Sequence, residues 1–404
     1  MKTLMLAALL AVPSASRAGD KPKVLTGIDV LQENGFRELK GKRVGLITNQ
    51  TGVDGKGVLT ARILAGAPGV QLTALFSPEH GFTGMSESTS VSSGRYLLPD
   101  GKEIPLYSLY GSTRAPTDEM LRGLDVLVFD IQDVGARFYT YATTMAYALE
   151  KAVKTDLEFI VLDRPNPING ETVEGPVLEI DGLKSFISYF PIPTRHGLTM
   201  GELARLHNFQ AKLGAKLVVI PLKEWRRKMW FDETGLPWVK PSPNMPDLDS
   251  ATLYPGIACF EASNLSVGRG TPLPFRWIGA PWLKADAVVA KMRKAKLPGI
   301  EFSAKAYTPE KSVHAGEKCP GILMKITDRE TLRPFAVFAH LVTAIRDLHP
   351  DDFSLGEGDR STRLIGSERF TAHFLNGADA KTILELFDPE ADRFRAQRAP
   401  FLLY

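Results

Sequence analysis

The segment Val126-Leu127-Val128-Phe129 leads directly into Asp130-Ile131-Gln132-Asp133, and this change from apolar to polar residues decides the fold. Two further apolar runs, at residues 72–76 and 159–162, also end in polar clusters, Ser77-Pro78-Glu79-His80-Gly81 and Asp163-Arg164-Pro165-Asn166. Such runs are typical of parallel strands that helices cover on both faces. Ligands of such sheets bind beyond the carboxyl ends of the strands, so we expect the three clusters to meet in one crevice of an enzyme.

Strand and helix patterns alternate from residue 43 to about residue 220. This alternation predicts an α/β fold, a Rossmann-like, doubly wound domain whose sheet is mainly parallel. Thr199 and Glu202 form a predicted capping box at the start of one helix. The expected strands are at residues 43–48, 71–76, near 104–109, 125–130, 158–162 and 216–220, and the expected helices are near 57–65 and at 139–153 and 199–213.

Five prolines between residues 236 and 256 are too many for a helix or a central strand, and they mark a domain junction. We therefore predict a Rossmann-like catalytic domain at residues 22–236, a proline-rich junction at 237–256 and a smaller mixed α+β domain at 257–404. The apolar end, Pro400-Phe401-Leu402-Leu403-Tyr404, is expected to dock on the protein. In the smaller domain we expect helices at 283–296, 334–348 and 380–386 and a strand near 321–327.

Residues 1–18 have the pattern of a secretory signal peptide: Met1-Lys2, an apolar stretch, and Ser16-Arg17-Ala18 before the cleavage site. The stretch is too short to span a bilayer, and no later segment reaches the roughly 20 apolar residues that a span needs. We expect an exported protein without stable membrane insertion, periplasmic or, as the alternative, secreted. Cleavage lowers the 49 basic residues to 47 against 46 acidic ones, a balance that does not indicate nucleic-acid binding.

Glu79 is the first candidate for a catalytic carboxyl group. It lies in a tight Pro78-Glu79-His80-Gly81 turn directly after a buried strand, where partial desolvation favours the protonated form that a general acid needs. The alternative is a structural role, in which Glu79 caps the next segment or pairs with a surface base. His80 is a candidate for binding substrate or, equally, a hydrogen-bonded wall residue.

Other loops carry groups suited to sugar binding. Asp133 and Arg137 precede the aromatic helix start Phe138-Tyr139-Thr140-Tyr141, although a structural ion pair would explain these two charges equally well. Glu171 and Glu174 follow the third polar cluster and are candidates for a second carboxyl group. The remaining candidates for substrate binding are Asp163, Arg164, Asn166, Arg195, His196, Asn244, Asn264 and Arg269.

The motifs of common cofactor sites are missing from the sequence. No Walker motif or GxGxxG spacing follows the first strand, so a nucleotide cofactor is disfavoured despite the Rossmann-like order. No HExxH or CxxC spacing is present, and a metal site would have to be assembled from distant loops. We therefore predict no cofactor and no metal.

Taken together, these motifs resemble the NamZ family of exo-β-N-acetylmuramidases, long catalogued as a domain of unknown function. The resemblance extends over nearly the whole mature chain. It implies a Rossmann-like domain with a smaller C-terminal domain, Glu79 at the position of the family's proposed catalytic glutamate, and Glu174 within its Glu-Gly-Pro motif. The matching segments include Ser77-Pro78-Glu79-His80-Gly81-Phe82, Asp130-Ile131-Gln132-Asp133-Val134-Gly135, Asp163-Arg164-Pro165-Asn166-Pro167, Val173-Glu174-Gly175-Pro176, Arg195-His196-Gly197, Pro241-Ser242-Pro243-Asn244-Met245-Pro246 and Ser266-Val267-Gly268-Arg269-Gly270-Thr271.

The resemblance implies release of a non-reducing terminal N-acetylmuramic acid from peptidoglycan-derived saccharides or muropeptides. Glycoside hydrolysis needs a protonated carboxyl group at the leaving oxygen and usually a second carboxylate, about 5 Å away for retention or roughly 6.5–9.5 Å for inversion. The substrate's own 2-acetamido group offers a third route. The lactyl carboxylate of muramic acid is an anion that an arginine can bind through two hydrogen bonds, and the candidates are Arg137, Arg164, Arg195 and Arg269.

Two other functions remain open at the level of sequence. A non-catalytic periplasmic muropeptide-binding protein would use the same cleft, with Glu79 only accepting hydrogen bonds. A metal-dependent cell-wall esterase or amidase would use Asp130, Asp133, Asp163 and His80. The oligomeric state is not predicted.

Overall fold

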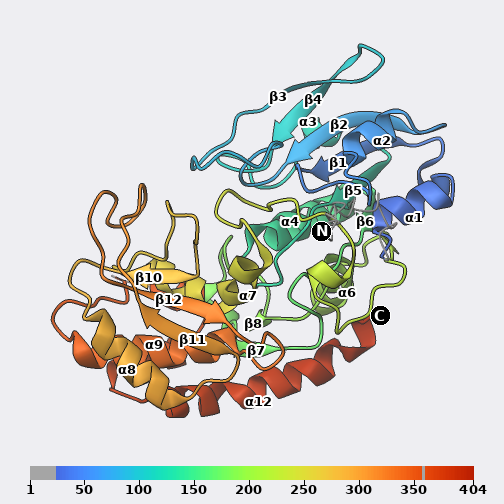
Figure 1. Ribbon diagram of the computed structural model, residues 1–404. Coiled ribbons are helices and arrows are strands. Elements are labelled where there is room, and N and C mark those ends of the chain that lie inside the picture. Colours follow the sequence, from blue (N-terminus) through green and yellow to red (C-terminus); the bar gives the residue numbers. More distant parts are fainter. Residues whose placement is uncertain (1–23, 357–359) are drawn as a thin grey trace, which may run out of the picture.

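The structure is a computed structural model that describes residues 24–356 and 360–404. The predicted signal peptide, residues 1–18, lies outside the described residues. Figure 1 shows a sheet domain with a second, mixed region beside it, and helix α12 (Ala380–Arg398) runs along the base of the molecule. Within the described residues, no helix is both long and apolar enough to cross a membrane.

The first domain contains a seven-stranded sheet in the order β3-β4-β2-β1-β5-β6-β9. All neighbouring strands are parallel except β3, which joins the edge in the antiparallel direction. The predicted mainly parallel sheet is therefore confirmed. Its strands are β1 (Arg43–Thr48), β2 (Gln71–Ser77), β3 (Gly94–Leu97), β4 (Glu103–Ser108), β5 (Val126–Asp130), β6 (Glu158–Leu162) and β9 (Leu217–Ile220).

Both faces of this sheet are covered, because successive side chains of a strand point to opposite faces. On β5, Val126 and Val128 join a hydrophobic core with α1 (Gly27–Glu33) and α2 (Thr60–Ala65). Leu127 and Phe129 join the larger core. That core includes residues of α4 (Thr140–Lys154) and α6 (Met200–Gln210) and continues into the C-terminal domain. The uninterrupted apolar runs of the sequence arise from this two-sided burial.

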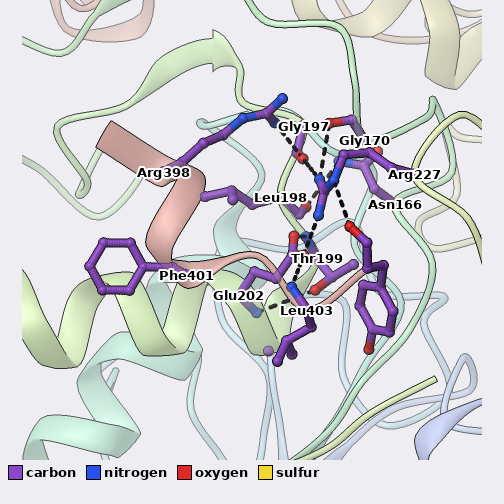
Figure 2. A network of polar contacts seen from close by, with 12 residues as sticks. Asn166, Gly170, Gly197, Leu198, Thr199, Glu202, Arg227, Arg398, Phe401 and Leu403 are labelled. Carbon is purple, nitrogen blue, oxygen red and sulfur yellow. Dashed lines mark hydrogen bonds and ion pairs between the residues drawn. The ribbon is translucent and has the colours of Figure 1, made fainter. Parts of the chain in front are cut away.

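The C-terminus docks beside the start of α6, as the sequence predicts. The predicted capping box is present: the Thr199 side chain accepts a hydrogen bond from the Glu202 amide, and a Glu202 oxygen accepts one from the Thr199 amide at 3.0 Å. Figure 2 shows Arg227 and the Leu403 amide converging on the same glutamate. The Tyr404 hydroxyl donates to Asp163 at 2.8 Å and accepts from the Leu222 amide at 2.8 Å.

The smaller C-terminal domain is mixed α+β, as predicted. Its antiparallel sheet has the order β10-β12-β11; helix α8 packs against it, and α9 packs against α8 and α7. A separate antiparallel pair, β7 with β8, places Glu174 opposite Arg195. Elements that precede this domain in the chain are α3 (Asp118–Leu121), β7 (Glu174–Val177), α5 (Ile180–Leu183), β8 (Pro193–Arg195) and α7 (Leu248–Ile257). The elements of the C-terminal domain are β10 (Trp277–Gly279), α8 (Ala285–Ala295), β11 (Ile300–Ala304), β12 (Gly321–Ile326), α9 (Pro334–Leu348), α10 (Arg360–Ile365), α11 (Glu368–Leu375) and α12.

Two predictions about proline are wrong. The proline-rich junction holds helix α7, whose first turn Asp247 caps at the Ser250 amide. Residues 250–257 are all buried, so packing outweighs the backbone hydrogen bond that Pro255 cannot donate. The predicted short helix at 380–386 continues through Pro389 to Arg398. Its buried face, with Ile383, Phe387, Ala391 and Phe394, is continuous across the proline, so packing outweighs the lost hydrogen bond.

Replacing Tyr404 by Phe should lower the free energy of unfolding by about 1–3 kcal/mol, because the Leu222 amide and the Asp163 carboxyl group lose their shared partner. Urea unfolding at pH 7 measures the change. Tyr96→Phe is the control, since Tyr96 packs on Phe82 and donates no hydrogen bond within residues 24–356 and 360–404. The control should cost less than about 0.5 kcal/mol. Equal losses in the two variants would contradict the docking role of the terminal hydroxyl.

Candidate active site

A cavity of about 630 Å³ opens between the two domains. From the sheet domain, its wall takes the turn after β2, with Glu79 and His80, and the start of α4. From the C-terminal side it takes Tyr254 of α7 and the loops that carry Glu261, Arg269 and Lys311. Its volume lies within the range of pockets that bind small molecules.

The turn after β2 presents Glu79 to this cavity. His80 has a positive φ of 69°, and Gly81 follows with a φ of 75°, so the chain reverses sharply after the strand. The His80 Nδ1 donates to the carbonyl oxygen of Ser86 at 2.6 Å, because a carbonyl can only accept. This bond joins the turn that carries Glu79 to the following loop.

The partners of the Glu79 carboxyl group are hydroxyl groups and not cations. The Thr140 hydroxyl, in the first turn of α4, donates to its Oε2. Burial, together with a hydrogen bond to the Glu79 carboxylate and its charge, raises the pKa of Tyr110. Among the ion pairs of the described residues, none includes Glu79. The carboxyl group is therefore held in place without a permanent positive partner.

Two more carboxyl groups line the same cavity, and each has a cation. Glu87 accepts from Asn244 at 3.0 Å and pairs with Lys311. The hydrogen bond from Lys311 lowers the pKa of Glu87, against the opposing effect of burial. Glu261 pairs with the Nε of Arg269. The cavity thus combines one carboxyl group without an ion pair and two ion-paired carboxylates.

Of the thirteen side chains predicted for the site, four line this cavity: Glu79, His80, Asn244 and Arg269. The other nine lie outside its lining, where the structure shows what they contact.

In two of the strand-end clusters, the charged side chains already have hydrogen-bond partners within the protein. After β5 and β6, Asp130 and Arg164 form a buried pair with two hydrogen bonds of 2.5 and 2.9 Å. Asp163 accepts from the Thr199 hydroxyl, the Gly201 amide and the Tyr404 hydroxyl. Burial raises the pKa of Asp163 to about 6. These charges stabilise loops and are not directed at the cavity.

Glu174, the predicted second carboxyl group, is also buried outside the cavity lining. Its Oε1 lies 3.6 Å from Arg195, and its Oε2 accepts from the Phe335 amide in the first turn of α9. A carboxylate at this end of a helix is favoured by the helix dipole. Arg195 also donates to the Ile168 carbonyl. These contacts connect β7, β8 and the first turn of α9.

The remaining predicted residues hold backbone segments. Arg137 does not pair with Asp133 but donates to four carbonyl oxygens, those of Pro176, Ile192, Leu364 and Ile365. Asn166 donates to the Leu198 carbonyl, and Asn264 joins Asp352 and Ser354. His196 accepts from the Leu198 amide, and burial lowers its pKa to about 3.

Several cavity residues were not identified from the sequence. Glu87 follows Glu79 in the segment between β2 and β3, whereas Tyr254 of α7 and Lys311 come from distant parts of the chain and join the cavity only through the tertiary fold. Tyr139, Thr140 and Tyr141 had a sequence signal, since they follow a polar strand-end loop at the start of a helix. That pattern is typical of sugar sites, but it does not single out the individual side chains.

Comparison with known proteins decides the family. Residues 44–249 match the N-terminal domain model of the exo-β-N-acetylmuramidase NamZ, and residues 252–404 match its C-terminal domain model. The chain belongs to the NamZ family. This membership confirms the predicted family and the predicted enzyme class, a glycoside hydrolase.

Relatives of this NamZ family member cover almost its whole length. The peptidoglycan β-N-acetylmuramidase NamZ of Bacillus subtilis is 42% identical over 398 residues, which are 98% of this chain and 95% of the relative. Two crystal structures of DUF1343 family proteins from Bacteroides fragilis are similar in fold. One has a TM-score of 0.88 at 38% identity and covers 95% of this chain and 100% of its own. The other has a TM-score of 0.73 at 30% identity and covers 94% and 99%.

Replacing Asp133 by Asn should make the protein more stable at neutral pH. The Asp133 Oδ1 accepts from the Gly135 amide at 2.7 Å, but its buried Oδ2 has no partner among the described residues. Burial raises the pKa of Asp133 to about 7. Since its ordinary value is near 3.8, the folded protein binds the extra proton between about pH 4 and 7, and this contribution to stability is lost as the pH rises through 7.

Asparagine does not titrate, so the difference in unfolding free energy between variant and wild type should grow from pH 4 to pH 8. Each pKa unit corresponds to about 1.4 kcal/mol, and we expect a total of about 1–4 kcal/mol. Urea unfolding at intervals across this range measures it, with the exposed Asp156→Asn as the control. A difference that is constant with pH would show that Asp133 does not carry the buried proton.

Proposed function

We propose that this protein removes a terminal β-linked N-acetylmuramic acid from the non-reducing end of peptidoglycan fragments, with Glu79 as the catalytic acid. The observation that carries the proposal is the position of Glu79 on the wall of the interdomain cavity, without an ion pair. The family and the name of the Bacillus subtilis relative support the substrate. The predicted signal peptide supports a site of action in the periplasm or the medium.

In this proposal Glu79 transfers its proton to the glycosidic oxygen while the bond between that oxygen and C1 breaks. Water supplies the hydroxyl group that C1 gains, and its second proton restores the acid. Thr140 and Tyr110 position the carboxyl group through their hydroxyls. Glu87 and Glu261 line the same cavity, but each is ion-paired with a cation, Lys311 and Arg269 respectively, so we assign proton transfer to Glu79 alone.

Replacing Glu79 by Gln should lower kcat for a chromogenic β-N-acetylmuraminide by a factor of about 10² to 10⁴, since a correctly placed acid contributes that much. Initial rates of dye release measure the loss. Glu171→Gln is the matched control, because Glu171 is exposed and outside the cavity lining, and it should retain wild-type turnover. Tight binding of the substrate by the wild type without any turnover would instead support a muropeptide-binding protein.

Arg269 is the arginine that we propose for recognition of the lactyl carboxylate. Of the four predicted arginines, it alone is in the described lining of the cavity. Glu261 occupies its Nε, and no hydrogen bond within residues 24–356 and 360–404 uses its two terminal nitrogens. Those two groups form the planar fork that binds a carboxylate through parallel hydrogen bonds.

Replacing Arg269 by Gln should reduce the preference for a muraminide over the corresponding glucosaminide by about 10-fold to 100-fold, because only the former has the lactyl anion. The ratio of kcat/KM values for the two substrates measures this preference. Arg360→Gln is the comparison, since Arg360 also lines the cavity but is exposed. An unchanged ratio in the Arg269 variant, or a larger change in the Arg360 variant, would refute the assignment.

A further inference from the structure

The Tyr139 hydroxyl is a buried group without a partner on the wall of the cavity. Tyr139 is 7% exposed, and its oxygen makes no hydrogen bond within the described residues. The hydroxyls of Ser242 and Tyr141 are close enough to lower the pKa of Tyr139 against the effect of burial, but no hydrogen bond of ordinary geometry joins either of them to its oxygen. The Tyr141 hydroxyl donates to the Pro241 carbonyl at 2.5 Å. A buried hydroxyl that has lost water without gaining a partner is costly, so its presence in a cavity wall indicates a ligand group that completes it.

The ring of Tyr139 cannot turn freely to find another partner. It meets Tyr141 edge-on at 4.9 Å between ring centroids and Tyr254 edge-on at 5.7 Å. Both neighbours are buried side chains of the same wall. The hydroxyl is therefore held in a fixed direction before any ligand binds, as a specific hydrogen bond requires.

The hydroxyl is a neutral donor. Burial raises the pKa of Tyr139, and the nearby carboxylates of Asp133 and Glu79 act in the same direction. A neutral phenol suits an uncharged acceptor such as an amide carbonyl oxygen. The anionic part of a substrate is better matched by Arg269.

The order of groups along the wall is given by their contacts. The Glu79 carboxyl group accepts a hydrogen bond from the hydroxyl of Thr140, the residue that follows Tyr139 in the chain. The Tyr139 ring contacts Tyr254, and the Tyr254 ring contacts Phe275 at 4.7 Å. The Arg269 guanidinium lies over Phe275 at 5.2 Å. Along the wall, the proposed proton donor Glu79 is thus followed by the neutral phenol of Tyr139, then by aromatic rings, and then by the guanidinium of Arg269.

The substituents of muramic acid follow the same order. C1 carries the glycosidic oxygen, C2 the acetamido group and C3 the lactyl ether with its carboxylate. When the glycosidic oxygen lies at Glu79 and the carboxylate at Arg269, the acetamido group lies between them, beside Tyr139. Its methyl group then faces aromatic rings, among them Tyr254, where an apolar group is favoured.

We propose that the Tyr139 hydroxyl donates a hydrogen bond to the carbonyl oxygen of the substrate's 2-acetamido group and so selects N-acetylated substrates. This assignment rests on the proposed function, because it takes its orientation from Glu79 and Arg269. Tyr139 is accordingly a specificity-determining residue of the cavity.

The test compares two chromogenic substrates, the β-N-acetylmuraminide and an analogue in which a hydroxyl group replaces the 2-acetamido group. In the wild type, kcat/KM should be at least about tenfold higher for the acetamido substrate. Tyr139→Phe, which keeps the ring, should lower kcat/KM for that substrate about tenfold and leave the value for the analogue within about twofold. Tyr147→Phe, the same change within α4, which begins directly after Tyr139, lies outside the cavity lining and should alter neither value.

Each other outcome is decisive. Equal loss on both substrates would overturn the assignment and place the hydroxyl's effect on Glu79 or the ring. No loss on either, or equal wild-type values for the two substrates, would also overturn it, the latter without any variant. If the wild type hydrolyses neither substrate, the proposed function itself fails. Thermal unfolding of Tyr139→Phe, compared with Tyr147→Phe, separates loss of the hydrogen bond from loss of the fold.

Discussion

The buried guanidinium of Arg137 is the contact on which the arrangement of the two domains depends. It donates to the carbonyls of Pro176 and Ile192 on one side and to those of Leu364 and Ile365, at the end of α10, on the other. Desolvation lowers its pKa only to about 10, so it stays charged at neutral pH. A buried charge is costly unless hydrogen-bond partners compensate it, and here carbonyl oxygens do so. The loop between β5 and α4 is thereby held against the helix that contributes Leu364 to the cavity.

Other paired charges explain why the cavity does not lie at the crevice expected of a doubly wound sheet. There, at the ends of β1 and β5, Asp130 is bound by Arg164 and by the Thr60 hydroxyl, and the chain fills the space. The polar groups that remain without such partners lie one strand further along, after β2, and at the start of α4. Packing of the C-terminal domain against this part encloses the cavity and excludes water from one side of it.

The sequence predicted the sheet domain well, because strands buried on both faces must be apolar throughout and because turns and caps carry local signals such as Thr199 and Glu202. It predicted helix ends poorly where prolines occur within helices, since the packing of Phe387 and Phe394 is invisible in local patterns. Of the residues that it predicts for the site, Glu79, His80, Asn244 and Arg269 line the cavity. The sequence could not distinguish the cavity residues Arg269 and Glu79 from Arg164 and Glu174, which are an arginine and a glutamate too. These last two are paired with other buried groups.

The sequence by itself determined the class of fold and the family, because burial patterns and short motifs are properties of neighbouring residues. The tertiary structure alone decided which charged side chains are free to meet a ligand. Whether a carboxylate or guanidinium faces a cavity or a partner depends on contacts between residues a hundred or more positions apart, as between Glu174 and Phe335 or between Asn244 and Glu87. Only folding brings such groups within hydrogen-bonding distance and decides which of them line the cavity.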